Sequence, residues 1–286
     1  LRRRPMKLKR IEALKQYEDR FMEMGMEANE AAAEAKHALS SIIGCDISDL
    51  YVKGAEYVTD TQQYRMNEVI KMRATGKPLA YILGERWFMG LKFFVTPDVL
   101  IPRQETELLA ETAIQHLRFG DYATVLDLCT GSGCVAVSIA KYSRARVTAT
   151  DISSAALEVA KKNAREIGAK VTFIESDLFN DVEGSYDIIT ANPPYVAEDI
   201  YEGLMREVRD FEPQMALVAK DRGLAFYRRI AKDAPNYLNK GGMILLEIGD
   251  EQGPDVKNIL IEAGFSDVKI RKDYSENARL ASGVLK

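Results

Sequence analysis

A chain of 286 residues with 47% hydrophobic and 29% charged residues is long enough for one large globular domain or two smaller ones. It has no apolar run of bilayer length and no recognisable signal peptide, so we expect a cytoplasmic protein with no membrane contact. The three cysteines and the two histidines, His37 and His116, show no metal-ligand spacing, so we expect reduced thiols and no metal site.

The net charge of −4 is unevenly distributed along the chain. Residues 11–86 carry nine Lys or Arg and thirteen Asp or Glu, which is a poor match for duplex DNA and favours a protein partner. The first ten residues hold six basic side chains, which we interpret as a disordered tail rather than an RNA attachment: Arg2, Arg3, Arg4, Lys7, Lys9 and Arg10.

Residues 8–75 show helical periodicity throughout. Gly25 ends the first predicted helix, Asn29 is placed to cap the second, and Asp60 is placed to cap a third that ends near Gly76. The apolar face of the first helix is predicted to comprise Ile11, Leu14, Tyr17, Phe21 and Met24.

The pattern changes after this helical stretch, and we predict a small helical domain over residues 1–83. Residues 84–102 are rich in aromatic and β-branched side chains, and Gly90 favours a turn, so this segment is predicted to be a linking hairpin. Pro102 then favours a helix over residues 103–118, with two acids in its first turn, Glu105 and Glu107.

From residue 124 onward, short apolar runs alternate with helical stretches, which is typical of a doubly wound, Rossmann-like α/β sheet within a domain spanning residues 103–286. The predicted strands are 124–128, 146–150, 170–175, 186–191 and 242–248, and the predicted helices are 134–143, 153–168, 222–238 and 252–263. Residues 266–271 and 279–285 are predicted to form an antiparallel pair at the sheet edge. Ligands should bind at the carboxyl ends of the parallel strands.

A glycine turn follows the first of these strands and consists of Cys129, Thr130, Gly131, Ser132 and Gly133. Its glycines allow a ligand to approach the main chain at a helix N-terminus. Asp151, at the end of the second strand, has the spacing of a carboxylate that binds both ribose hydroxyls. We therefore predict a ribonucleoside cofactor; the alternative is that Asp151 only caps the helix beginning at Ser153.

A corner formed by Asn192, Pro193, Pro194 and Tyr195 ends the fourth strand. Proline has no N–H, so the corner offers carbonyl acceptors with few competing donors. We predict that Asn192 Oδ1 and the Pro193 carbonyl accept the two hydrogens of a planar –NH2 group and that Tyr195 stacks on its plane. The alternative is an ordinary loop.

Two cofactor classes fit the glycine turn, because Gly131-Ser-Gly133-Cys-Val-Ala136 also matches the dinucleotide pattern of a nicotinamide oxidoreductase. The acids beside the turn and after the third strand, Asp127 and Asp177, together with the Asn192 corner, favour a methyl donor with an amine or amide acceptor.

These residues resemble the release factor glutamine methyltransferases, which use S-adenosylmethionine. The Asn-Pro-Pro-Tyr corner alone is also similar to enzymes that methylate amino groups of DNA bases. The resemblance rests on segments along nearly the whole chain: 73–82, 88–93, 100–107, 127–133, 192–195, 211–217 and 273–279.

The resemblance implies methyl transfer to the glutamine amide in the Gly-Gly-Gln motif of class I peptide chain release factors, with S-adenosylhomocysteine as product. It places the glycine turn near the methionine portion of the cofactor, Asp151 on the ribose, Asp177 and Leu178 near adenine, and Asn192 at the methyl end. The helical N-terminal domain would help to hold the protein substrate.

The sequence departs from the family pattern at three places. Cys129 replaces a glycine, Ala219 and Lys220 replace a glycine pair, and Leu178 stands where an aromatic residue can occur. These departures bear on cofactor affinity and on the shape of one loop rather than on the reaction.

Three residues have open roles: Arg103, Thr106 and Glu107 could meet the methionine tail of the cofactor or form a capped helix start. The rival functions are an adenine-specific nucleic-acid methyltransferase, a nicotinamide oxidoreductase, and a scaffold that retains the pocket without catalysis. The acidic helical region argues against a direct nucleic-acid substrate.

Overall fold

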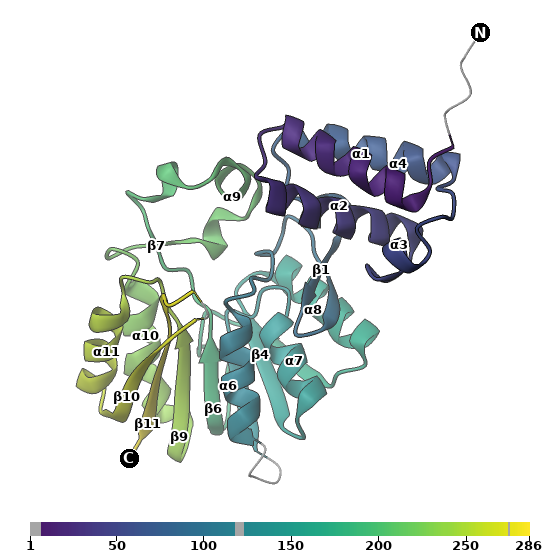
Figure 1. The fold of residues 1–286 in the computed structure, drawn as a ribbon. Helices are drawn as coiled ribbons and strands as arrows, with labels where there is room; N and C mark the ends of the chain where they lie inside the picture. Colours follow the sequence, from purple (N-terminus) through teal and green to yellow (C-terminus); the bar gives the residue numbers. More distant parts are fainter. Residues whose placement is uncertain (1–6, 118–122, 274) are drawn as a thin grey trace. The chain divides into compact units, whose positions relative to one another are not determined.

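The computed structural model describes residues 7–117, 123–273 and 275–286. The chain divides into two compact units, one ending at Gly84 and the other beginning at Glu85 (Figure 1). Arg2, Arg3 and Arg4 of the basic tail lie outside the described residues, as does the predicted helix end at residue 118. Within the described ranges, none of the helices has the length and apolarity needed for a membrane span.

The first unit is helical, as predicted. Its core is built mainly from the first, second and fourth helices and includes Leu14, Tyr17 and Phe21. Ile11 was predicted to share this face but is 43% exposed, and Ala13 is buried instead. The helices are α1 (Arg10–Glu23), α2 (Ala28–Ile43), α3 (Asp49–Val52), α4 (Asp60–Arg73) and α5 (Leu79–Leu83).

Two predicted helix caps in this unit are wrong. Asn29 lies inside the first turn of α2, which begins at Ala28. Thr59 rather than Asp60 caps α4, because Gln62 N donates to Thr59 Oγ1 (3.2 Å) while Thr59 N donates to Gln62 Oε1 (2.9 Å). This reciprocal capping box satisfies two backbone N–H groups at once, which a single aspartate one residue later cannot do.

The second unit opens with the predicted hairpin, formed by β1 (Glu85–Phe88) and β2 (Leu91–Phe94). Its two-residue turn holds Met89 at φ +53° and Gly90 at φ +71°, the left-handed conformation of tight hairpin turns. Phe88 and Phe93 are buried against each other and against the helices that cover the sheet. The hairpin therefore packs as part of the second unit.

A seven-stranded sheet forms the centre of the second unit, in the order β10-β11-β9-β6-β3-β4-β5. The five strands from β9 to β5 are parallel, and β11 and β10 continue the sheet in antiparallel fashion, so the predicted fold class and antiparallel edge are confirmed. The strands are β3 (Thr124–Leu128), β4 (Arg146–Asp151), β5 (Val171–Glu175), β6 (Tyr186–Ala191), β9 (Leu238–Glu247), β10 (Phe265–Lys272) and β11 (Ala278–Leu285).

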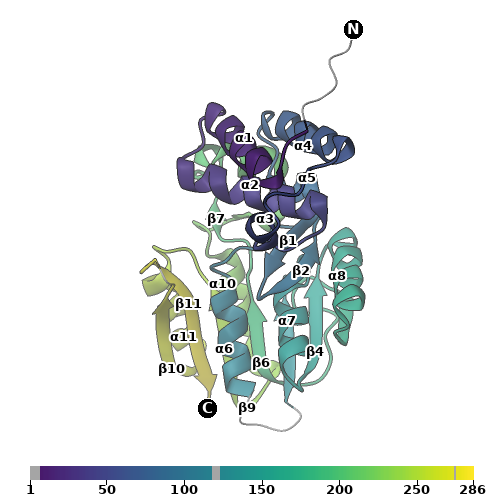
Figure 2. The ribbon, with the colours of Figure 1, turned by 45° about the vertical axis from the view of Figure 1, so that its right-hand side comes forward.

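Helices cover both faces of the sheet because apolar side chains alternate between the faces along each strand. Val125 and Ile188 face one core, and Leu126 and Ile189 face the other. Figure 2 shows α6 and α7 over the nearer face. One core includes side chains of α6 (Glu107–Leu117), α7 (Cys134–Tyr142) and α8 (Ser154–Ile167), and the other those of α10 (Ala225–Asp233) and α11 (Gly253–Glu262).

Two predicted helices and the segment between β6 and α10 differ from the prediction. The helix predicted to begin at residue 103 begins at Glu107, because residues 104–106 form a tight turn in which Glu107 N donates to Gln104 O (3.0 Å). The helix predicted over 222–238 ends at Asp233 and is followed by a 3₁₀ turn. The intervening segment contains elements that were not predicted: β7 (Val196–Ala197), α9 (Arg206–Phe211) and β8 (Val218–Ala219).

Candidate active site

A cavity of about 410 Å³ opens at the carboxyl ends of β3, β4 and β6, where ligands were expected. Its volume is within the range of small-molecule sites. It is lined by most of the predicted site residues, namely Cys129, Thr130, Gly131, Ser132, Asp151, Asp177, Leu178, Asn192 and Pro194, and by Arg103 and Thr106. Gly133, Pro193, Tyr195 and Glu107 are not among the lining residues.

The glycine turn adopts the backbone conformation that its sequence indicated. Gly131 has φ +55° and Gly133 has φ +79°, which L-residues rarely adopt. A Cβ on Gly133 would lie 3.0 Å from Ala160 Cβ, whereas a Cβ on Gly131 would meet nothing within 4 Å. Gly133 is therefore required by packing of α7 on α8, while Gly131 leaves open space at the cavity.

Cys129 also has a positive φ, +54°. This explains why a glycine is expected at this position, since a residue with a Cβ is strained there. Burial, and then the neighbouring acids Asp151, Asp127 and Asp177, raise the pKa of the Cys129 thiol well above its usual value. The thiol is therefore protonated at neutral pH, so Cys129 is expected to be an unreactive residue of the turn.

Asp127 holds the turn to the sheet. Its Oδ2 accepts a hydrogen bond from Thr130 Oγ1 (2.6 Å), and its Oδ1 accepts one from Thr190 Oγ1 of β6 (2.7 Å). The carboxyl group is 1% exposed, and burial raises its pKa to about 6 despite these two bonds. Asp127 thus joins β3, β6 and the glycine turn below the cavity.

Asp151 presents both carboxylate oxygens at the cavity. Oδ2 accepts from Gly131 N (2.8 Å) and Oδ1 from Ser153 N (3.0 Å). The cap of α8 is Ser153, whose hydroxyl accepts from Ala156 N (3.1 Å), so capping does not occupy Asp151. Because a carboxylate can accept about four hydrogen bonds, two positions stay available for a diol. Burial raises the pKa of this carboxyl group.

The remaining residues of the pocket suit a nucleoside. Ser132 Oγ is buried and, within the described structure, has no hydrogen-bond partner. Leu178 is buried at φ +56°, and its carbonyl accepts from Ser176 Oγ (3.0 Å). Asp177 forms an exposed ion pair with Arg229 (2.8 Å) at the rim. An unpaired hydroxyl at Ser132, an apolar wall at Leu178 and the remaining acceptor positions of Asp151 fit a ribonucleoside cofactor.

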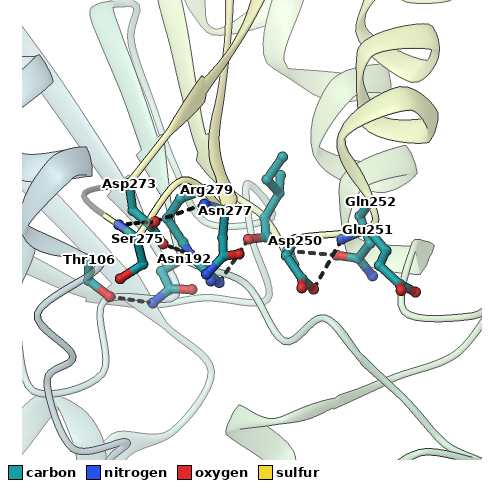
Figure 3. Close-up of polar contacts among 11 residues, drawn as sticks. Thr106, Asn192, Asp250, Glu251, Gln252, Asp273, Ser275, Asn277 and Arg279 are labelled. Carbon is teal, nitrogen blue, oxygen red and sulfur yellow. Dashed lines mark hydrogen bonds and ion pairs between the residues drawn. The ribbon is translucent and has the colours of Figure 1, made fainter.

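The Asn192 corner follows β6, as predicted. Asn192 Nδ2 donates to Thr106 Oγ1 (3.3 Å), the residue just before α6 (Figure 3). This bond leaves Oδ1 as the acceptor of the amide. Pro193 and Pro194 are buried, and Tyr195 is partly buried.

The backbone of Tyr195 is tightly fixed. Its carbonyl accepts from Gln252 Nε2 (3.0 Å), and a Cβ on Gly223 would lie only 2.1 Å from the same oxygen. Burial raises the pKa of the Tyr195 phenol. The corner is therefore held in place by two segments, at Gly223 and Gln252, that the sequence did not associate with it.

Arg103 and Glu107, whose roles the sequence left open, both form contacts with other parts of the second unit. Arg103 pairs with buried Glu212, which also accepts from Ile101 N (3.2 Å). Glu107 Oε1 accepts from Met89 N (2.6 Å), so Glu107 fixes the β1–β2 turn. In the described part of the chain, no group of three His, Cys, Asp or Glu side chains is arranged to hold a metal ion.

Sequence reasoning missed Glu247, which is 2% exposed at the end of β9. The sequence feature that could have identified Glu247 is its position directly after the apolar run of residues 243–246. A charge that ends a buried strand at the ligand-binding edge of a parallel sheet is a candidate site residue.

Two family models match the chain. The Methyltransferase small domain matches residues 104–207, and the PrmC N-terminal domain matches residues 12–84. The "Release factor glutamine methyltransferase" of Neisseria gonorrhoeae is 41% identical over 254 residues, covering 87% of this chain and 92% of the relative. The protein of the same name from Geobacter sulfurreducens is 38% identical over 255 residues, covering 88% and 89%.

Among solved structures, a methyltransferase from Pyrococcus furiosus aligns with a TM-score of 0.52 at 20% identity. The alignment covers 79% of this chain and 98% of that one. At this identity the match supports the fold and nothing finer.

Proposed function

Since the chain belongs to the release factor glutamine methyltransferase family, we infer that it methylates the side-chain amide nitrogen of the glutamine in the Gly-Gly-Gln motif of class I peptide chain release factors. It is an S-adenosylmethionine-dependent enzyme, and S-adenosylhomocysteine is its product. Family membership confirms the resemblance seen in the sequence and supports methylation of glutamine over the nucleic-acid alternative.

The observation that carries the site assignment is the orientation of Asn192 at the cavity. Its Nδ2 donates to Thr106, so its Oδ1 is available for an incoming N–H. We propose that Oδ1 and the Pro193 carbonyl accept the two hydrogens of the substrate amide. An amide nitrogen is a poor nucleophile because its lone pair is delocalised, and two such bonds fix its orientation and favour localisation of the lone pair.

Tyr195 is assigned to the wall against which the flat substrate amide stacks, beside Pro194. Its backbone is held by Gln252 and by close contact with Gly223, which would keep this wall in register with Asn192. The chain has only two histidines, and the mechanism requires no general base before transfer, because the proton leaves the amide afterwards.

The cofactor supplies an electrophilic methyl group on a sulfonium. We assign the turn from Cys129 to Gly133 to its methionine portion, Asp151 to the ribose hydroxyls, and Asp177 and Leu178 to adenine. The free acceptor positions of Asp151 and the unpartnered Ser132 hydroxyl support this assignment.

The helical first unit is assigned to holding the protein substrate. Residues 11–86 carry a net charge of −4, which supports a protein partner and argues against direct binding of nucleic acid. Because release factors act in translation termination, we place the reaction in the cytoplasm.

Asn192→Ala tests the site. We expect S-adenosylhomocysteine binding by calorimetry to stay within about threefold of wild type, while turnover falls about 100-fold or more, since removing one catalytic hydrogen-bonding group costs 10²–10³ in rate. Turnover is followed as transfer of labelled methyl to a release factor, to its variant without the Gly-Gly-Gln glutamine, and to DNA. Unchanged turnover in the Asn192 variant would place the acceptor site elsewhere, and label on DNA alone would overturn the proposed substrate.

A further inference from the structure

Three side chains from separate elements meet behind the proposed acceptor site: Asn192, Thr106 and Glu247. The strands β6 and β9 are parallel neighbours in which Ala191 is paired with Leu246. The next residues along these strands, Asn192 and Glu247, therefore lie side by side at the carboxyl edge. Thr106 and Glu247 are each 2% exposed.

Glu247 has an unusual environment for a carboxylate. The Thr106 hydroxyl lies close enough to lower the pKa of Glu247 as a hydrogen-bonding neighbour, while Oε2 is buried without a hydrogen-bond partner in the described structure. A buried carboxylate with one empty oxygen is costly for the fold, so a purely structural position would favour an apolar residue. Tyr227 does not relieve this cost, because its hydroxyl donates to the Glu247 backbone carbonyl (2.9 Å).

The hydroxyl of Thr106 has a single hydrogen, and this fixes the direction of the whole chain of bonds. An ionised Glu247 can only accept, so Thr106 is the donor in any hydrogen bond between the two side chains. The lone pairs of Thr106 then face Asn192, which can approach only with its Nδ2 (3.3 Å). The Asn192 amide is consequently turned with Oδ1 away from Thr106.

We propose that Thr106 and Glu247 are positioning residues that fix the amide of Asn192 with its oxygen toward the substrate. The proposal rests on the proposed function of Asn192 as acceptor of the glutamine N–H. Without this pair, the Asn192 amide can flip and present –NH2 groups to a substrate that itself donates, which is a repulsive arrangement.

Valine and serine at position 106 provide the matched test, because Val keeps the shape without the hydroxyl and Ser restores the hydroxyl. We expect Thr106→Val to lower kcat about 10- to 100-fold, as misorientation of a catalytic group does. KM for the release factor and Kd for S-adenosylhomocysteine should stay within about threefold. Thr106→Ser should recover most of the lost kcat.

A second comparison separates positioning from loss of structure. In the Asn192→Ala background there is no amide to orient, so Thr106→Val should cause no further loss of turnover. An equal loss in both backgrounds, or no recovery with serine, would overturn the proposal.

The pH dependence of kcat in the Glu247→Gln variant provides a further test, because a purely structural role of Glu247 would not affect it. Burial raises the pKa of Glu247 to about 7, and its charged neighbours are Arg279, Glu105 and Arg103, with the Tyr195 phenol also nearby. Ionised Glu247 sets the direction of the hydrogen bonds through Thr106 to Asn192. Wild-type kcat should therefore rise as the pH increases through about 7. Glutamine can both donate and accept, so the variant should lose this rise and have a lower plateau.

Asp127 and Asp151, the other carboxyl groups whose pKa is raised by burial, are present in both proteins and cancel in this comparison. The same rise in the Glu247 variant would overturn the proposal. If wild type methylates the release factor but all three substitutions leave kcat unchanged, the positioning role alone fails. If wild type does not methylate a release factor while it binds S-adenosylhomocysteine, the proposed function fails.

Discussion

The ribose assignment of Asp151 leads to a quantitative prediction for Asp151→Asn. The carboxylate accepts one backbone N–H on each oxygen, from Gly131 and Ser153, and has one further position per oxygen for the two ribose hydroxyls. Asparagine keeps one acceptor oxygen and loses the charge. A hydrogen bond to a charged group contributes about 1.5–3 kcal/mol, so losing one bond and the charge assistance of the other should cost about 2–4 kcal/mol of binding free energy.

This cost corresponds to S-adenosylhomocysteine binding about 30- to 700-fold more weakly, measured by titration calorimetry. Asp187→Asn is the matched control, because Asp187 Oδ2 also accepts a backbone N–H, from Thr124 (2.7 Å), but lies near the start of β6 away from the cavity. The control should lose stability without changing affinity more than about twofold. A folded Asp151→Asn protein that binds within threefold of wild type would refute the ribose assignment.

Three further predictions concern the turn and the corner. Gly223→Ala should destabilise the protein by about 2–4 kcal/mol in urea unfolding and lower turnover, because its Cβ would overlap the Tyr195 carbonyl at a positive φ; wild-type stability would contradict the contact. The folded-state pKa of Asp127 is raised from 3.8 to about 6, so the folded state holds a proton more tightly than the unfolded state and stability falls as pH rises through this window. Wild type should therefore lose about 2 kcal/mol relative to Asp127→Asn between pH 4.5 and 7.5 in paired urea titrations, and an equal pH dependence would contradict this. Iodoacetamide should label Cys129 slowly at pH 7.5, with a rate still rising above pH 9, since its thiol pKa is raised; rapid labelling at pH 7.5, seen by mass spectrometry, would show an exposed thiolate.

The strands β3 and β6 could be predicted closely because nearly all of their residues are buried. The bounds predicted for β3 and β6 are those of the structure, and the glycine turn and the Asn192 corner follow them directly. Such strands are continuous apolar runs ended by glycine or proline, so their limits are visible in the sequence.

The segment between Tyr195 and Leu224 could not be predicted for a physical reason. Its strands β7 and β8 have two residues each, too few to show any periodicity, and they form through contacts with each other. Yet this segment supplies Glu212, which pairs with Arg103, and Gly223, which packs against Tyr195.

The bonds among site residues were equally hidden. Thr106 and Asn192 are far apart in sequence, and only the packing of α6 on the sheet brings them together. Glu247 was overlooked because one acidic residue after an apolar run also fits a solvent-exposed strand end. Residue types thus indicated the chemistry, while the arrangement that orients Asn192 depends on the fold.

The decisive test of the proposed activity is tandem mass spectrometry of a release factor after reaction with isotope-labelled S-adenosylmethionine. We expect one labelled methyl group on the side-chain amide nitrogen of the Gly-Gly-Gln glutamine, and its transfer should depend on Asn192. A methyl group on another residue, or equal labelling by the Asn192→Ala protein, would contradict it.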